Sequence, residues 1–164
     1  MSATADASFL IGISVVELVG VAEQVIGACY VPPAVWTEVV VQGDGRPRAA
    51  RAPWSPWLQL RPVHNQHAVE ALTAFLGRGE SEAVVLAQEL GCTMVLTDDL
   101  RARHVVRQAG LTPMGVIGFL LAAKAIGRVD EVRPLISRLQ AAGFRLGSAL
   151  VAEALRSAGE DLVE

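Results

Sequence analysis

Residues 91–110 read GCTMVLTDDLRARHVVRQAG and predict the end of one helix, a buried strand and a second helix. The first glycine is suited to cap a helix that precedes it. Met94–Leu96 is a wholly apolar run of strand length. The acidic pair Asp98 and Asp99 follows this strand at once, and a helix from Leu100 to Gln108 comes next. A short apolar strand between two helices is typical of a parallel sheet covered by helices.

The same order of strand and helix recurs on both sides of this stretch. A first strand is predicted to end at Thr4–Asp6, before a helix from Ser8 to Val19, and a second strand at Ala28–Val31 precedes a helix begun by two prolines. Later strands are predicted at Trp57–Val63 and Leu111–Gly115, and later helices at His67–Phe75, Glu80–Leu90, Val116–Ala125, Asp130–Ala142 and Gly147–Ser157. The fold class is therefore α/β, a three-layer sandwich with a central, mostly parallel sheet flanked by helices.

Two of the helices carry apolar residues at helical spacing, which predicts their buried faces. The helix after the prolines is expected to turn Val35, Trp36, Val39 and Val40 inward, and the helix before Gly91 to bury Ala83, Leu86, Ala87 and Leu90. Residues Gln42 to Pro56 are rich in Gly, Pro and Arg and are expected to form a loop.

Composition places the chain among small intracellular proteins. Its 164 residues, 52% of them hydrophobic, suit one domain over residues 1–164. No secretory leader or run of about 18 apolar residues is evident, so we expect no membrane span. Cys29 and Cys92 lack nearby Cys or His partners and are expected to be buried free thiols, which indicates the cytoplasm.

The net charge of −3 and the pI of about 5.6 argue against a protein that coats DNA. They do not exclude a nuclease, because carboxylates that hold metal ions make a chain acidic and the bound ions restore attraction for phosphate.

Five carboxylates follow or adjoin the predicted strands. Asp6, Asp98 and Asp99 come at the carboxyl ends of strands, where ligands collect in open α/β sheets. Glu80 opens the helix that leads to Met94–Leu96, and Glu38 lies on the proline-led helix. Each alone has a structural explanation, as a helix cap, a partner of the helix dipole or a solvated residue. Together they would repel one another unless a cation lay among them.

Oxygen ligands without His or Cys favour Mg²⁺ or Mn²⁺ over zinc. Such ions can promote cleavage of a phosphodiester bond. Of the two acids near the start of the helix before Gly91, Glu80 is preferred to Glu82 as the site residue, because it lies nearer the middle of the apolar stripe of that helix. Glu82 is then a neighbouring supporting or solvent-facing acid. The choice between Asp98 and Asp99 stays open.

Four stretches together resemble the PIN-domain nucleases, in the branch related to VapC-type toxin ribonucleases. They are ADASFLI at 5–11, VPPAVWTEV at 31–39, GRGESEA at 77–83 and LTDDLRAR at 96–103. The resemblance implies RNA cleavage with Mg²⁺ or Mn²⁺, a catalytic set of Asp6, Glu38, Glu80, Asp98 and Asp99, a homodimer and a small antitoxin partner. Ser8 and Thr97 would orient carboxylates through their hydroxyl groups.

The sequence departs from the PIN pattern at two places. Ser2–Ala5 is small and polar where an apolar strand is usual, which predicts a frayed first strand. Val116 stands where relatives often have Thr, so a polar group near the site is replaced by an apolar one.

Several basic side chains are candidates for contact with the substrate. Arg101, Arg103 and Arg107 follow the acidic pair on one helix and are candidates to bind RNA phosphates. His64 and His67 lie in polar surroundings that indicate an exposed loop, with no role at the site.

Two other functions remain to be weighed. A catalytically silent module of the same fold, used for dimerisation or for antitoxin or RNA binding, is the main alternative. A receiver-type phosphoryl-transfer domain would need a lysine near the acids, whereas Lys124, the only lysine, lies on a late apolar helix.

Overall fold

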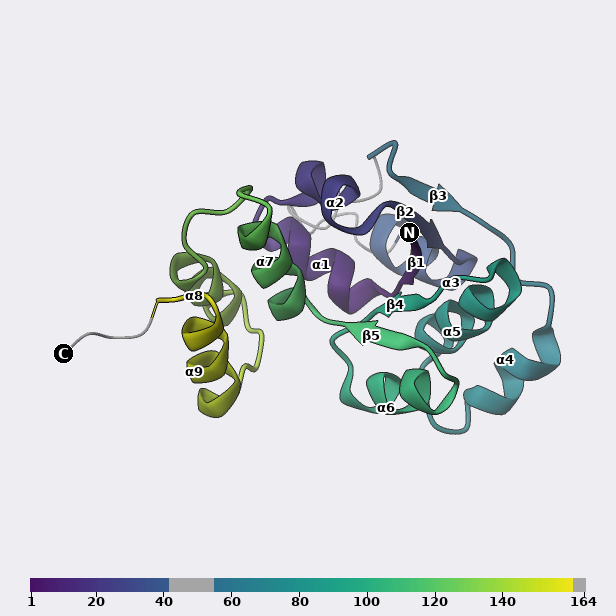
Figure 1. Cartoon of the computed structure of the whole chain (residues 1–164). Coiled ribbons are helices and arrows are strands. Elements are labelled where there is room, and N and C mark those ends of the chain that lie inside the picture. The colour runs from purple at the N-terminus through teal and green to yellow at the C-terminus, as the bar shows by residue number, and fades with distance from the viewer. Residues whose placement is uncertain (42–54, 161–164) are drawn as a thin grey trace.

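A parallel sheet forms the middle layer of the protein (Figure 1). The computed structural model describes residues 1–41 and 55–160, and within these residues the sheet has five strands in the order β3-β2-β1-β4-β5. All neighbouring strands are parallel. The strands are β1 (Ser2–Ala5), β2 (Ala28–Val31), β3 (Leu58–Leu60), β4 (Met94–Leu96) and β5 (Thr112–Met114). The predicted parallel sheet is confirmed, and β3 is shorter than expected.

Helices connect the strands and extend the chain beyond β5. They are α1 (Ala7–Val15), α2 (Val19–Ile26), α3 (Pro33–Trp36), the π-helical turn η1 (Thr37–Val41), α4 (Gln66–Leu72), α5 (Arg78–Leu90), α6 (Leu100–Gln108), α7 (Val116–Ala125), α8 (Arg133–Ala141) and α9 (Ser148–Ser157). The helix predicted from Ser8 to Val19 was too long, because the chain turns at Glu17, whose φ is 60°. A second helix, α2, was not predicted.

The two faces of the sheet are covered by different helices. Ala3 and Ala5 of β1 join the core cluster that includes residues of α1, α2 and α7. Thr4, between them, points to the other face and donates a hydrogen bond of 2.7 Å to the Ala83 carbonyl of α5. Val95 of β4 packs on that same side with α5 and α6. Figure 1 shows the resulting three layers, with α8 and α9 gathered beyond α7. The predicted sandwich is confirmed.

The prediction of a frayed first strand is wrong. β1 is the central strand, hydrogen-bonded to β2 on one side and β4 on the other. Ala3, Thr4 and Ala5 have no exposed surface. Burying the Thr4 hydroxyl costs little because the Ala83 carbonyl accepts its hydrogen bond. Small side chains therefore suit a strand that is covered by helices on both faces.

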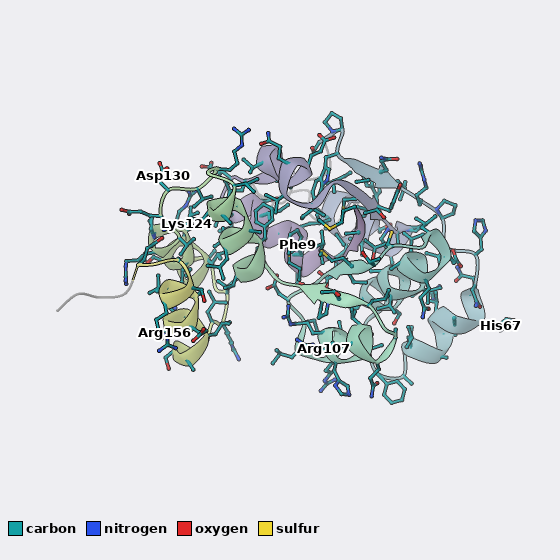
Figure 2. All side chains as sticks on the ribbon, in the orientation of Figure 1. Phe9, His67, Arg107, Lys124, Asp130 and Arg156 are labelled. Atoms are coloured by element: carbon teal, nitrogen blue, oxygen red, sulfur yellow. The ribbon has the colours of Figure 1, made fainter. Side chains whose placement is uncertain are left out.

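Close packing of α1 and α7 fixes the helical layer beside the site. Phe9 and Phe119 meet edge to face, with ring centroids 5.8 Å apart, a contact that contributes about 0.5–1.5 kcal/mol beyond burial. Figure 2 shows Phe9 inside the protein. A Cβ on Gly12 would lie 2.6 Å from Cγ2 of Val116, so α1 needs glycine at this crossing. Val116 is fully buried there and supports the packing of α7.

The predicted buried faces are largely observed. Val35 and Val39 are buried, and Trp36 packs partly buried against the same core. Ala83, Leu86 and Ala87 are fully buried, but Leu90 is 41% exposed because it ends α5. Both cysteines are buried free thiols, as expected. The predicted loop from 42 to 56 lies mostly outside the described residues, and so does the side chain of Val40.

None of the helices in residues 1–41 and 55–160 is both long and apolar enough to cross a lipid bilayer.

Candidate active site

Asp6 is held at the carboxyl end of the central strand. It follows β1, caps the N-terminus of α1 and is 1% exposed. Its Oδ1 accepts hydrogen bonds from the Ser8 hydroxyl at 2.7 Å and the Phe9 backbone N–H at 3.1 Å. Its Oδ2 accepts one from the Thr97 hydroxyl. The expected helix-cap role is real, and the predicted roles of Ser8 and Thr97 as orienting hydroxyls match these contacts.

The environment of Asp6 opposes its negative charge. Burial raises the pKa of Asp6 to about 7, although the hydrogen bonds from Thr97, Ser8 and Phe9 act to lower it. The charge of Glu80 raises this pKa further. Asp6 and Glu80, which are 74 positions apart in the sequence (80 − 6), thus interact electrostatically in the folded protein. A cation near them would instead favour the ionised form of Asp6.

Glu80 lies in the first turn of α5 and borders two adjoining hollows. One, of about 460 Å³, is also lined by Glu38 and Thr37. The other, of about 320 Å³, is also lined by Asp99 and Arg101. We call the two together the acidic cleft, because Glu38, Glu80 and Asp99 all line it. Asp6 does not line the cleft, and it is connected to the cleft through its electrostatic interaction with Glu80.

Two glycines before Glu80 lie close to side chains of the acidic cleft. The carboxylate of Glu80 lies against the Cα of Gly77, where a Cβ would collide with Oε2. A Cβ on Gly79 would lie 3.2 Å from Cγ2 of Val35 and 3.4 Å from Oε2 of Glu38. Glu38 itself is carried by the π-helical turn η1, a distortion that often marks functional sites. The stretch GRGESEA at 77–83 carries these glycines beside its acids, and their close approach to Glu80, Val35 and Glu38 was not predicted.

Asp99 and Asp98 have different surroundings despite being adjacent. Asp99 caps α6 by accepting a hydrogen bond of 2.8 Å from the Ala102 backbone N–H, and it also lines the acidic cleft. Oδ1 of Asp98 accepts one of 3.0 Å from the Val116 backbone N–H, at the start of α7. Its Oδ2 is buried and, among the described residues, has no hydrogen-bond partner.

The carboxylate of Asp98 is held tightly against the start of α7. Burial raises the pKa of Asp98, against the lowering effects of the Val116 N–H and of Arg103. A Cβ on Gly115 would lie 2.6 Å from its Oδ1, so this approach requires glycine.

Glu82 does not line the acidic cleft, but it contacts two residues that do, Ala34 and Arg78. It is 6% exposed, and its Oε2 accepts a hydrogen bond of 2.8 Å from the Ala34 backbone N–H in the first turn of α3. Its Oε1 lies 3.3 Å from Nε of Arg78. Glu82 is therefore not solvent-facing; it joins α5 to α3 directly behind residues that line the cleft. Of the two candidates, Glu80 is the one that borders the cleft.

The three candidate arginines of α6 point in different directions. Arg101 lines the acidic cleft together with Asp99. Nη1 of Arg103 donates a hydrogen bond of 3.2 Å to the Thr97 carbonyl and lies beside Asp98. Arg107 is exposed in the last turn of α6, and Figure 2 labels it on the outer surface of the protein. Arg101 alone of the three borders the cleft.

The histidines and the lysine considered above as possible site residues do not line the acidic cleft. His64 and His67 are exposed, as expected, and Figure 2 shows His67 at the outer end of α4. Lys124 pairs with Glu160 at 2.6 Å, at the opposite end of the protein. A receiver-type site therefore has no lysine near these acids in the described part of the chain.

The donor set suits a hard cation that keeps part of its water shell. Within residues 1–41 and 55–160, no three His, Cys, Asp or Glu side chains gather closely enough to enclose a metal ion. Mg²⁺, however, is commonly bound through one or two carboxylates and retains several waters. The pair Asp6 and Glu80 supplies oxygen ligands only. Burial, and to a lesser degree the charge of Glu80, raise the pKa of Asp6, and a bound cation would oppose both effects.

Comparison with known proteins agrees with this geometry. The family model described as PIN domain matches residues 2–160. No match was found among curated proteins or among solved structures. PIN domains are generally nucleases, and the match takes in all five strands and every acid discussed above. This chain belongs to the PIN-domain family.

Proposed function

We propose that the protein is a metal-dependent endoribonuclease whose centre is formed by Asp6 and Glu80, with Glu38 and Asp99 around the same cleft. The observation that carries the proposal is the electrostatic interaction between Asp6 and Glu80. Burial is the main cause of the raised pKa of Asp6, and the charge of Glu80 raises it further, whereas three hydrogen bonds act to lower it. A structural ion pair would lower that pKa instead. Perturbed carboxyls beside a cleft are typical of functional sites.

Asp6 and Glu80 would hold Mg²⁺ or Mn²⁺, with Asp99 and Glu38 on either side. Bound there, a divalent cation supplies Lewis acidity to a phosphodiester and neutralises charge that develops during its cleavage. Hydrolysis adds one water across a P–O bond: phosphorus gains the water oxygen, and the departing oxygen takes up a proton. No oxidant or reductant is needed.

Other side chains of the site would orient Asp6 and attract the RNA phosphate. The hydroxyls of Ser8 and Thr97 hold Asp6 in one orientation, as the hydrogen-bond partners of metal ligands commonly do. Arg101, at the edge of the acidic cleft, offers a cation to an RNA phosphate that would otherwise be repelled by the acids. Arg103 holds the Thr97 carbonyl and so fixes the strand end that carries Asp98 and Asp99.

We further propose, from the similarity of the four sequence stretches to VapC-type ribonucleases, that this activity is the toxin of a toxin–antitoxin pair. The protein would then act as a homodimer and be neutralised by a small antitoxin. A reading frame for a small protein directly beside this one, whose product binds and inhibits it, is the expected finding. A monomer that no neighbouring product inhibits would contradict this part of the proposal.

The nuclease activity is tested by RNA digestion with Mg²⁺, with Mn²⁺ and with EDTA, using the wild type and Asp6→Asn. Asp130→Asn is the matched control, because Asp130 is exposed and lies at the opposite end of the protein (Figure 2). We expect metal-dependent cleavage by the wild type and the control and none by Asp6→Asn. Full activity of a folded Asp6→Asn variant would end the proposal.

The second candidate is a silent module of the same fold. It is favoured by one observation: in the described residues no three metal-type side chains gather at a single point. Calorimetric titration with Mn²⁺ separates the two functions. A nuclease should bind Mn²⁺ and lose that binding with Asp6→Asn or Glu80→Gln, whereas a silent module should show no binding linked to these residues.

A further inference from the structure

A second hollow lies next to the acidic cleft, between α4 and α6. Its volume is about 740 Å³, and its walls include Leu72, Val105 and the strongly exposed side chains of Phe75 and Leu100. Phe75 is 67% exposed and Leu100 82% exposed. We call it the Phe75 hollow. Single exposed apolar residues are ordinary, but an exposed aromatic ring facing a hollow with a second exposed apolar side chain is a feature of binding surfaces.

The Phe75 hollow and the acidic cleft are continuous. Ala74, Phe75 and Arg101 line both the hollow and the part of the cleft that contains Glu80 and Asp99. The junction is formed on one side by the turn after α4 and on the other by the start of α6. A chain molecule with one group at the acids would therefore place its next group against Phe75.

The charges along the Phe75 hollow suit a polyanion. Arg101 and His104 are its titratable lining residues, and no carboxylate is among the described residues that line it. An unpaired base stacks readily on an aromatic ring, and arginine commonly contacts the phosphate beside it. The apolar wall and the aromatic ring suit a base, and the arginine at the junction suits the phosphate beside it. An apolar peptide would use the wall and the ring but would leave the arginine without an anionic partner, so one nucleotide of a single strand is the better match.

We propose that the Phe75 hollow holds one unpaired base of the RNA, next to the phosphate bound at the acidic cleft. The inference rests on the proposed nuclease function and deepens it, since it adds a base-binding subsite beside the cleft where cleavage is proposed. The base stacks on Phe75, Leu100 covers the other side of the hollow, and Arg101 pairs with the phosphate between the two sites. Base-paired RNA cannot offer such a base without unpairing it.

The test measures binding and cleavage separately. Anisotropy of a short fluorescein-labelled single-stranded RNA, with Ca²⁺ in place of Mg²⁺, is compared for wild type, Phe75→Ala, Phe75→Trp and Leu150→Ala. Leu150 is the matched control, because it is 48% exposed on α9 and lines neither hollow. We expect Phe75→Ala to raise Kd about tenfold, Phe75→Trp to bind at least as well as wild type, and the control to be unchanged. Leu100→Ala is a second probe should Phe75→Ala fold poorly.

Cleavage provides the positional readout. Phe75→Ala should raise KM about tenfold with kcat little changed, and an abasic nucleotide next to the cleaved bond should remove the difference between variant and wild type. A duplex of the same sequence should bind more weakly than the single strand.

The outcomes distinguish this inference from the nuclease proposal. Cleavage by the wild type with equal KM in Phe75→Ala overturns the base site and leaves the nuclease intact. Binding that depends on Phe75 without cleavage in any metal supports the base site and rejects the nuclease. If Phe75→Ala changes the oligomeric state or the binding of a protein partner while Kd for RNA stays the same, the hollow is a protein interface and the inference is overturned. Absence of RNA binding by the wild type also overturns it.

Discussion

The Thr97 hydroxyl donates a hydrogen bond to Oδ2 of Asp6, and so joins two residues that are 91 positions apart in the chain. The same hydroxyl oxygen accepts a hydrogen bond of 3.2 Å from the Asp99 backbone N–H. Because β1 and β4 are neighbours in the sheet, their carboxyl ends meet at one edge, and Thr97 connects the acids at both ends. The orientation of Asp6 is thus coupled to that of the Asp98 and Asp99 pair.

Without metal, Asp6→Asn should stabilise the protein at alkaline pH. The pKa of Asp6 is raised by burial to about 7, from an ordinary value of 3.8. Between these values the native state retains a proton that the unfolded chain has released, so the free energy of unfolding falls as pH rises across the window. The loss reaches up to about 4 kcal/mol by pH 8. This loss of unfolding free energy with rising pH should be absent in Asp6→Asn.

The measurement is thermal unfolding in EDTA at pH 5 and at pH 8. Wild type should have the lower Tm at pH 8, Asp6→Asn should change less, and Mn²⁺ at pH 8 should raise the Tm of wild type only. Asp130→Asn is the control and should follow the wild type. If both proteins became more stable from pH 5 to pH 8 in EDTA, the claim that burial opposes the charge of Asp6 would be refuted.

Glu80 and Glu82, two residues apart on α5, should respond differently to the same substitution. Glu80→Gln should remove metal-dependent cleavage with little loss of stability, because Glu80 borders the cleft. Glu82→Gln should retain cleavage but lower the free energy of unfolding by about 1–2 kcal/mol, because Glu82 is buried against Arg78 and the N-terminus of α3. Urea unfolding and RNA digestion of both variants measure the two effects. Loss of cleavage in Glu82→Gln together with full cleavage by Glu80→Gln would contradict this assignment.

Asp98 and Asp99 can be separated in the same manner. Asp99→Asn keeps an acceptor for the Ala102 N–H, so α6 stays capped while the charge at the acidic cleft is lost. We expect about a tenfold to hundredfold loss of cleavage rate with little change in Tm. Asp98→Asn should reduce cleavage by less than about tenfold, since the Asp98 carboxylate faces α7. Equal losses in the two variants would contradict this division of roles.

Much of the fold was evident in the sequence because its signals are local. The apolar run Met94–Leu96 and the prolines at 32 and 33 mark strand and helix starts within a few residues. The placement of Asp6 and Asp99 near one edge followed from parallel strands alone. The family match agrees with the resemblance seen in the four acidic stretches.

What could not be predicted depends on contacts between distant residues. The burial of Thr4 rests on a carbonyl 79 positions later, and no local pattern announces it. Likewise, helical periodicity ranked Glu80 above Glu82 but gave no sign that Glu82 caps α3, 48 positions away. The turn at Glu17 requires a positive φ that non-glycine residues seldom adopt, so α1 was predicted too long and α2 was missed.

Thr97→Val should shift the pH dependence of the site upward. Valine keeps the shape of threonine but removes the donor to Asp6 and the acceptor for the Asp99 N–H. Since the Thr97 hydrogen bond lowers the pKa of Asp6, its loss should raise that pKa further, and metal binding needs the ionised carboxylate. The pH at which Mn²⁺ binding is half-maximal should therefore rise by roughly one unit. Titrating Mn²⁺ binding against pH in wild type, Thr97→Val and Thr97→Ser measures the shift. Thr97→Ser restores the hydroxyl and should return the midpoint to the wild-type value, whereas an unchanged midpoint in Thr97→Val would show that the hydroxyl does not control the charge of Asp6.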